Sequence, residues 1–175
     1  MACDFVQTYD LLFRQVYDFF IVQLSSRRVV YTAGTRNPTQ AWTTQQLRNA
    51  TMAGETPAIL LRDRDAKFGP DFDRVAKGAG ARVVKTAVRA PNMNAIAERF
   101  VGSVRREVLD YVLVRGDEHL DALLREYRTY FNESRPHQAL GQRTPSGGAI
   151  AADTSRPITS RSVLRGLHVD YRRAA

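Results

Sequence analysis

Hydrophobic and polar residues alternate along the first part of the chain in the manner of short β-strands. Three stretches rich in β-branched and aromatic residues follow one another, at 2–10, 15–24 and 27–35. This pattern predicts three strands in a meander. From residue 37 the spacing of the apolar residues becomes that of a helix, with Thr39 as its N-cap.

Strand-like and helix-like segments alternate after the meander. "PAILLRD" is a continuous apolar run that predicts a strand covered on both faces. "GPDFDRVAKGAG" has proline at the start and glycine at the end, as short helices do. We expect a further strand, a long helix and a strongly amphipathic helix capped by Asp117, at 81–88, 94–114 and 117–135. The order β-β-β-α-β-α-β-α-α predicts a mixed α/β domain, an antiparallel meander leading into parallel strands flanked by helices.

The composition changes near residue 146. Glycine, serine, threonine, alanine and proline dominate "SGGAIAADTSRPITSRS", which has no apolar period and predicts a mobile linker. A short basic piece, "VLRGLHVDYRRAA", follows it. We therefore divide the chain into a core at 1–145 and a flexible linker with a basic tail at 146–175.

The charge balance points to a polyanionic partner. Lys and Arg number 26 against 18 Asp and Glu, which gives a net charge of +8. A strongly basic soluble domain most often binds nucleic acid, although an indifferent basic surface is the alternative. Cys3 is the single cysteine, which excludes an internal disulfide and suits a reducing cytoplasm. We see neither a signal peptide nor an apolar run long enough to cross a membrane.

Three acidic residues occupy positions that a crossover sheet could bring together. Asp4 lies in the first strand, Asp63 ends the fourth, and Glu98 lies near the start of the long helix. Three carboxylates at one point repel one another unless cations lie between them. Oxygen ligands favour Mg²⁺ or Mn²⁺, and a pair of such ions suits in-line attack at phosphorus. The alternative is that these acids are helix caps and solvated charges.

Several motifs, in this order, give the chain a family resemblance. They are "CDFVQTYD", "LSSRRVV", "LLRDRDAKFG", "APNMNAIAERFVGSVRREVLD" and "YRTYFNESRPHQALGQRTP", which together span about residues 2–145. The sequence resembles the integrase-core (Asp-Asp-Glu) transposases of bacterial insertion sequences, which are related to retroviral integrases. The resemblance implies a ribonuclease-H-like fold, two Mg²⁺ or Mn²⁺ ions, and cleavage and joining of DNA ends.

The same resemblance implies that Asp4, Asp63 and Glu98 are the catalytic metal ligands. Asp63 and Glu98 stand 35 positions apart, as the last two acids of the family do. We expect Asp65 to be a loop charge paired with Arg62 or Lys67.

Two further acids lie near the first strand. Asp10 precedes the first hairpin turn and is expected to have a turn role, and Asp18 has no counterpart in the resemblance. We therefore expect the carboxyl groups of the catalytic trio to converge within about 8 Å, close enough to share two ions.

Basic and amide residues flank Glu98. Arg105 lies seven residues after Glu98 on the same helical face, and in the family a basic residue there contacts DNA. The alternative is a surface network of Arg105 and Arg106 with Glu107. Residues just before the helix could contact phosphates, because helix N-termini attract anions. Our expected DNA-binding residues are Arg89, Asn92, Asn94, Arg105 and Arg106. We expect His137 to anchor a turn on the core rather than act as a base.

The sequence thus predicts the catalytic core of a DNA transposase or integrase. Its partners would be transposon ends and target DNA, and it would act as a homo-oligomer in the cytoplasm of a bacterium, on the nucleoid and away from membranes. Two alternatives stay open: a nuclease of the same fold that cuts without joining, and a non-catalytic DNA-binding remnant.

Overall fold

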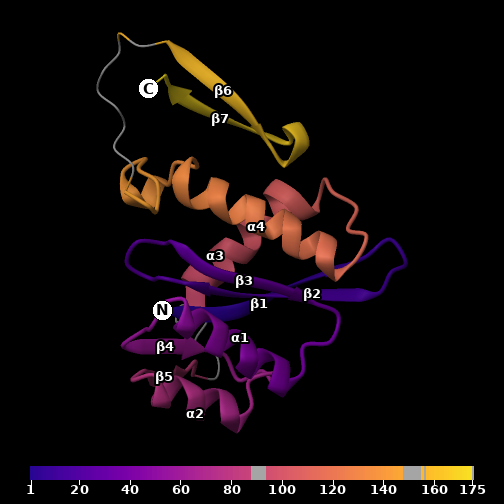
Figure 1. Ribbon diagram of the computed structural model, residues 1–175, viewed down its shortest axis with the longest axis vertical. Helices are drawn as coiled ribbons and strands as arrows, with labels where there is room; N and C mark the ends of the chain where they lie inside the picture. The colour runs from indigo at the N-terminus through magenta and orange to yellow at the C-terminus, as the bar shows by residue number, and fades with distance from the viewer. Residues whose placement is uncertain (88–93, 148–154, 156, 175) are drawn as a thin grey trace.

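The computed structural model describes residues 1–87, 94–147, 155 and 157–174. Figure 1 shows a layered molecule in which a twisted sheet lies between helices, with a separate two-stranded hairpin outside the last long helix. This is the mixed α/β arrangement that the order of elements predicted.

The main sheet has five strands in the order β3-β2-β1-β4-β5. Its first three strands, β1 (Ala2–Tyr9), β2 (Gln15–Val22) and β3 (Val29–Thr35), pair antiparallel as the predicted meander. β4 (Ile59–Arg62) then pairs parallel with β1, and β5 (Arg82–Lys85) pairs parallel with β4. The crossovers place the short strand β4 beside the first strand, in the middle of the sheet. The sheet is the ribonuclease-H-like arrangement that we expected.

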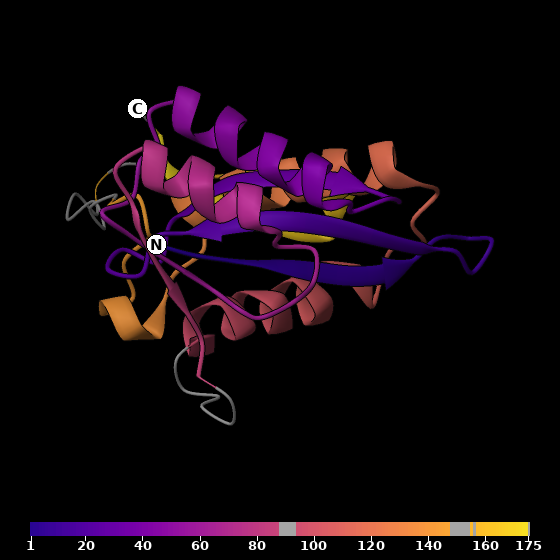
Figure 2. The same cartoon turned by 90° about the horizontal axis from the view of Figure 1, so that it is seen from below.

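Helices cover both faces of this sheet (Figure 2). Phe19 and Ile21 of β2 pack in a cluster with the helices α1 (Gln40–Met52) and α2 (Pro70–Gly78). Phe20 and Val22 point the other way, into the cluster formed with α3 (Ala95–Val104) and α4 (Asp117–Glu133). The alternation along β2 therefore gives each face of the sheet its own apolar core. Within the described ranges no helix is long and apolar enough to cross a membrane.

The helix ends follow local chemistry. Thr39 caps α1 as predicted, because its hydroxyl accepts a hydrogen bond from the backbone N–H of Trp42 at 3.2 Å. The predicted continuous helix over 94–114 is wrong: α3 ends at Val104, a π-helical turn follows over Arg105–Leu109, and the chain then leaves the helix. Val114 instead accepts a hydrogen bond from the backbone N–H of Leu11 at 2.8 Å, which ties this segment to the first hairpin. Asp117 is the first residue of α4, and Gly116 is its N-cap.

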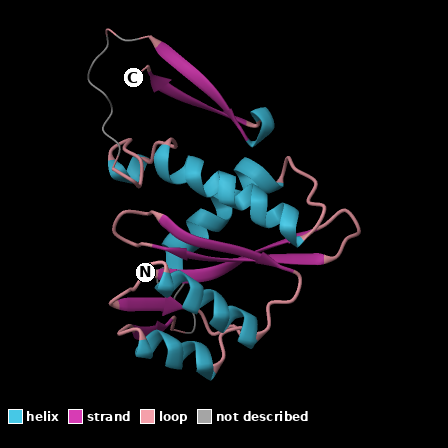
Figure 3. Cartoon of the chain, viewed as in Figure 1, coloured by secondary structure: helices cyan, strands magenta, loops and turns pink. Residues whose placement is uncertain are grey.

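The C-terminal segment is partly different from our expectation. Where we expected a flexible linker and a basic tail, β6 (Ile158–Val163) and β7 (His168–Arg173) form an antiparallel hairpin, which Figure 3 shows apart from the main sheet. The His168 ring stacks on Tyr130 of α4 with ring centres 4.9 Å apart. Of the predicted mobile linker at 146–162, residues 158–162 belong to β6, and 148–154 and 156 lie outside the described residues.

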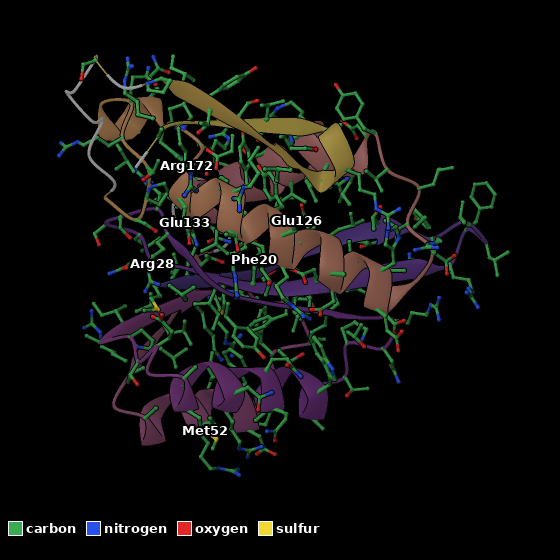
Figure 4. All side chains as sticks on the ribbon, turned by 45° about the horizontal axis from the view of Figure 1, so that its top comes forward. Phe20, Arg28, Met52, Glu126, Glu133 and Arg172 are labelled. Atoms are coloured by element: carbon green, nitrogen blue, oxygen red, sulfur yellow. The ribbon has the colours of Figure 1, made fainter. Side chains whose placement is uncertain are left out.

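Further contacts hold this hairpin on α4 (Figure 4). The backbone N–H of Leu164 donates to the Glu126 carboxylate at 2.7 Å, and Arg172 lies 3.8 Å from that of Glu133. Val163 and Leu164 are buried in the same cluster as α3 and α4. The apolar pair at the hairpin turn, rather than a period along the strands, is what anchors this segment.

Candidate active site

Asp4 lies in β1, and Asp63 directly follows the neighbouring parallel strand β4. Ala2 of β1 pairs with Leu61 of β4, and Asp63 comes just after Arg62, the last residue of that strand. Ala2 and Leu61 both belong to the core under α3, and residues two apart share a face of a strand. The Asp4 carboxylate therefore faces the α3 side of the sheet, and the charge of Asp63 acts on it from the end of the neighbouring strand.

The start of α3 lies over Asp4. Ala97 and Phe100 are buried against the sheet and fix the helix there. Asn94, the N-cap residue, is 6% exposed, and its side-chain amide donates a hydrogen bond to Asp4 Oδ2 at 2.8 Å. Glu98 follows one turn later on an exposed part of the helix. The fold thus assembles Asp4, Asp63 and the first turn of α3 from segments distant in sequence.

The other acids of this region affect the pKa of Asp4. Burial raises its pKa, the hydrogen bond from the Phe5 backbone N–H opposes that effect, and the charges of Asp63, Asp65 and Glu98 raise it further. The outcome is an Asp4 pKa of about 6. A carboxylate that is destabilised by negative neighbours is a favourable place for a cation.

The loop after β4 is held by its own hydrogen bonds. Asp63 Oδ1 accepts from the Asp65 backbone N–H at 3.0 Å, and Asp65 Oδ2 pairs with the Lys67 ammonium at 2.6 Å. Buried Arg62 pairs with Asp73 and donates to the Asp63 carbonyl, both at 2.8 Å. Asp65 therefore has the loop role that we expected, with Lys67 rather than Arg62 as its partner.

The donor set of this site suits a hard cation. Asp4, Asp63 and Glu98 offer carboxylate oxygens, and the side-chain carbonyl oxygen of Asn94 is buried with no hydrogen-bond partner among the described residues. Such oxygens are the ligands that Mg²⁺ and Mn²⁺ prefer. Across the described ranges no three Asp, Glu, His or Cys side chains form a ready-made metal cluster. The residues fit a divalent ion by chemistry, and the predicted convergence of all three carboxylates within about 8 Å stays a prediction.

The two other acids near the first strands, Asp10 and Asp18, have surroundings away from the candidate site. Asp10 accepts hydrogen bonds from the backbone N–H groups of Leu12 and Arg14 and from the Arg14 and Arg36 side chains. Burial alone would raise the pKa of Asp10, but the hydrogen bonds from Arg14 and Leu12 and the charge of Arg14 lower it to about 2. Asp10 is thus the turn residue that we expected. Asp18 is fully buried, and the charged groups that act on it belong to α4, not to Asp63.

The expected DNA-binding residues divide into three groups. Arg89 and Asn92 lie outside the described residues. Asn94 points inward to Asp4, so its amide supports the carboxylate. Arg105 and Arg106 are exposed, and Arg105 donates to the Gln7 carbonyl at 3.0 Å.

The alternative of a surface network between Glu107 and the two arginines before it does not hold. Glu107 binds Arg135 at 2.8 Å and accepts from the Tyr127 hydroxyl at 2.8 Å, so it is tied to α4 and not to Arg105 or Arg106. His137 anchors its turn as expected, with its ring 4.5 Å from that of Phe131 and Nε2 3.2 Å from the Phe131 carbonyl oxygen. Burial lowers the pKa of His137, as suits a neutral structural ring.

Sequence reasoning missed the contact between Asn94 and Asp4. Asn94 precedes Glu98 by four residues, which is one helical turn, so a polar side chain on the same face was visible in the sequence. What was not visible is which strand that face meets.

Part of the chain matches a known protein family. Residues 79–145 match the family model described as the integrase core domain. This stretch begins before β5 and includes α3 and α4, and therefore Asn94 and Glu98.

Two curated relatives are transposases of Escherichia coli K12. Over 92 residues, 51% of this chain, the sequence is 38% identical to the putative transposase InsD for insertion element IS2E and covers 42% of that protein. It is equally identical over the same length to the transposase InsD for insertion element IS2D, of which it covers 30%. The chain spans less than half the length of these relatives.

Three solved structures with the same fold come from retroviral proteins. The catalytic core domain of HTLV-2 integrase in complex with magnesium matches with a TM-score of 0.65 at 14% identity, over 83% of this chain and 92% of that one. The catalytic core domain of BIV integrase matches with a TM-score of 0.63 at 17% identity, over 83% and 90%. A chain of the simian T-cell lymphotropic virus intasome, in complex with PP2A regulatory subunit B56 gamma, matches over 97% of this chain and 64% of its own, with a TM-score of 0.67 at 13% identity.

Proposed function

Because the chain carries an integrase core domain, distantly similar to the IS2 InsD transposases and folded like a retroviral integrase core, we propose that it is the catalytic core of a DNA transposase. In this role it cleaves DNA strands and joins them to target DNA with the help of divalent metal ions. The catalytic residues are Asp4, Asp63 and Glu98.

One observation carries the proposal. Asp4 lies on β1 beside the strand that Asp63 follows, under the start of the helix that bears Glu98, and its pKa is raised to about 6 by burial and by the charges of Asp63, Asp65 and Glu98. A structural carboxylate is expected to have cationic partners, as Asp10 has in Arg14 and Arg36. Asp4 has acidic neighbours instead, which is the electrostatic setting of a metal site.

The residues divide the chemistry between them. Asp4 and Asp63 would hold Mg²⁺ or Mn²⁺ from the rigid sheet, and Glu98 would complete the site from α3. Two such ions would supply an activated oxygen nucleophile and stabilisation of the leaving oxygen. Asn94 orients the Asp4 carboxylate by its hydrogen bond. Arg105, an exposed residue at the C-terminal end of α3, would hold a DNA phosphate beside the site.

The proposed partners follow from this reaction and from the relatives. Transposon ends and target DNA are the substrates, and the net charge of +8 favours both. The solved HTLV-2 integrase cores are described in dimeric and trimeric forms, and we propose that this chain also acts as a homo-oligomer. Because the similar transposases are bacterial, we place its action on the bacterial nucleoid.

The test is metal-dependent nicking of DNA by the full chain. We expect supercoiled plasmid to be nicked with Mg²⁺ or Mn²⁺ but not with Ca²⁺, and the D63N and E98Q variants to be inactive. D65N is the matched control, because Asp65 is paired with Lys67 in the adjacent loop. Nicking that survives in D63N or E98Q would refute the assignment.

The products then separate the alternatives. Strand-transfer products made from an oligonucleotide end and a target plasmid support a transposase, and cleavage without joining identifies a nuclease. DNA binding with no cleavage under any metal identifies a non-catalytic remnant.

A further inference from the structure

A pocket lined by arginines lies on the other side of α3 from Glu98. It has a volume of about 380 Å³ and is formed by α3, the β2–β3 turn and the segment that follows α4. That volume falls within the range of about 300–1,000 Å³ of small-ligand sites. Four arginines contribute to its wall: Arg27, Arg99, Arg106 and Arg135. We call it the arginine pocket.

Three of these arginines have uncompensated charges. Arg135 is paired with Glu107, its Nε lying 2.8 Å from the carboxylate. Arg27, Arg99 and Arg106 have no acidic partner in the part of the chain that the structure describes. Arginines brought together without acids raise the local positive potential and favour an anion between them.

The rest of the pocket supports a ligand larger than a simple ion. Its lining includes Phe100 and Pro136, which are apolar, and the amides of Gln138 and Gln142, which can donate or accept hydrogen bonds. The turn that carries these amides is fixed by the contact of His137 with Phe131. The turn that forms part of the pocket is therefore held in place. The pocket also offers charged, polar and apolar groups, which suit the phosphate, the polar edges and the apolar faces of a nucleotide.

The helix α3 links this pocket to the candidate active site. Glu98 and Arg105 lie seven residues apart on one face, and Arg99 and Arg106 repeat that spacing on the adjacent face. The Arg106 guanidinium lies back over the helix at Gly102, where an added Cβ would be 3.0 Å from Nη1. A nucleic-acid strand bound near Glu98 can thus extend across α3 and contact Arg99 and Arg106.

We propose that the arginine pocket is a phosphate-binding subsite for a nucleic-acid strand, which it holds beside the active site through Arg27, Arg99 and Arg106. The proposal rests on the proposed function, because it takes the ligand to be the DNA on which the carboxylates act. It adds two residues, Arg27 and Arg99, that neither the resemblance nor the sequence indicated.

Binding of a single-stranded oligonucleotide tests the subsite. For the R27A/R99A double variant we expect affinity to fall about a hundredfold, since two charged hydrogen bonds are lost. The slope of log K against log salt should flatten by about 1.4, at about 0.7 for each phosphate contact. R27K/R99K should recover part of the affinity, because lysine restores the charge but not the bidentate geometry.

The matched control removes the same charge from the opposite face of the sheet. R48A/R74A changes two exposed arginines of α1 and α2 and should alter affinity by less than about twofold if the pocket is specific. Equal losses in the two double variants would overturn the proposal, since they would show a general charge effect. Loss of binding to inorganic polyphosphate that matches the loss for DNA, with R48A/R74A unaffected, would still support a phosphate site.

The two proposals fail in different ways. If R27A/R99A binds DNA as wild type does while wild-type protein nicks plasmid, the subsite is wrong and the catalytic assignment stands. If D63N and E98Q still nick DNA while R27A/R99A binds it weakly, the catalytic assignment is wrong and the subsite stands as a DNA-binding pocket.

Discussion

Two carboxyl groups on neighbouring strands, Asp4 and Asp18, face the same side of the sheet in different environments. Burial raises the pKa of both. Asp4 accepts hydrogen bonds from the Phe5 backbone and the Asn94 side chain, and lies near the exposed Glu98. Asp18 is fully buried, and among the described residues neither of its oxygens has a hydrogen-bond partner of normal geometry.

The difference lies in what surrounds each carboxyl group. Asp4 has hydrogen-bond donors that orient it and other acids beside it, so its unfavourable charge can be relieved by a cation. Asp18 has α4 over it, with Asp121 raising its pKa and Arg128 and the Ala33 backbone only partly opposing the effects of burial and Asp121. A raised pKa therefore indicates a functional site only when the site also has access and organised neighbours. For Asp18, which lacks such access and neighbours, the raised pKa means that the charged carboxylate lowers the stability of the fold.

The largest expected effect separates the two acids by activity. D4N should lower metal-dependent DNA nicking by about a thousandfold or more, because a lost metal ligand removes several kcal/mol of transition-state stabilisation. D18N should leave nicking within about twofold of wild type, after normalisation to folded protein. Plasmid-nicking rates at saturating Mg²⁺ measure both, and equal losses would break the comparison.

A smaller loss is expected when only the orientation of Asp4 is disturbed. N94A removes the 2.8 Å hydrogen bond to Asp4 and should lower activity about 10- to 100-fold, as outer-shell partners of metal ligands do. If Asn94 acts as a positioning residue, raising the Mn²⁺ concentration should recover part of the nicking rate. A uniform loss that excess Mn²⁺ does not relieve would instead indicate a DNA contact.

A substitution at Gly34 tests how closely α4 packs over Asp18. An added Cβ there would lie 2.9 Å from the Asp117 carbonyl oxygen and 3.2 Å from Asp121 Cβ, so α4 would have to move. We expect G34A to lower the free energy of unfolding by about 1–3 kcal/mol, as overpacking typically does. Denaturant unfolding measures this, and an unchanged midpoint would show that α4 is not closely packed on the strand.

Replacing Asp18 should raise the free energy of unfolding, whereas G34A should lower it. D18V removes a buried carboxyl group without partners and should raise the free energy of unfolding by about 1–3 kcal/mol at neutral pH. The folded-state pKa of Asp18 is raised, so its contribution to the stability of the wild-type protein is most favourable below the unfolded pKa of about 3.9 and is lost as pH rises through the folded value. The advantage of D18V should therefore widen from pH 4 towards pH 8 in unfolding curves. A constant difference would contradict a buried, titrating Asp18.

The sequence predicted the fold better than it predicted the surroundings of these acids. Alternation along β2 and the Pro70 and Thr39 signals placed strands and helices, because such signals are local. The end of α3 was missed, since Val114 leaves the helical path to pair with the first hairpin. The C-terminal hairpin was missed because Val163 and Leu164 anchor it on α4 through contacts that no local period reveals.

The candidate site shows the same division. Asp4 and Asp63 could be proposed from their strand positions and the family resemblance, and the register between β1 and β4 supports that choice. The contact of Asn94 with Asp4 and the arginine pocket depend on how α3 and the turn after α4 meet the sheet. Those are tertiary contacts between residues far apart in sequence, so no spacing in the chain predicts them.

The central claim is that Asp4, and not Asp18, belongs to a metal-binding site. Calorimetric titration of Mn²⁺ into the wild-type protein and the D4N and D18N variants tests it without any need for DNA cleavage. We predict that D18N binds Mn²⁺ as wild type does, and that D4N binds at least about tenfold more weakly. Loss of Mn²⁺ binding in D18N with retention in D4N would contradict the account.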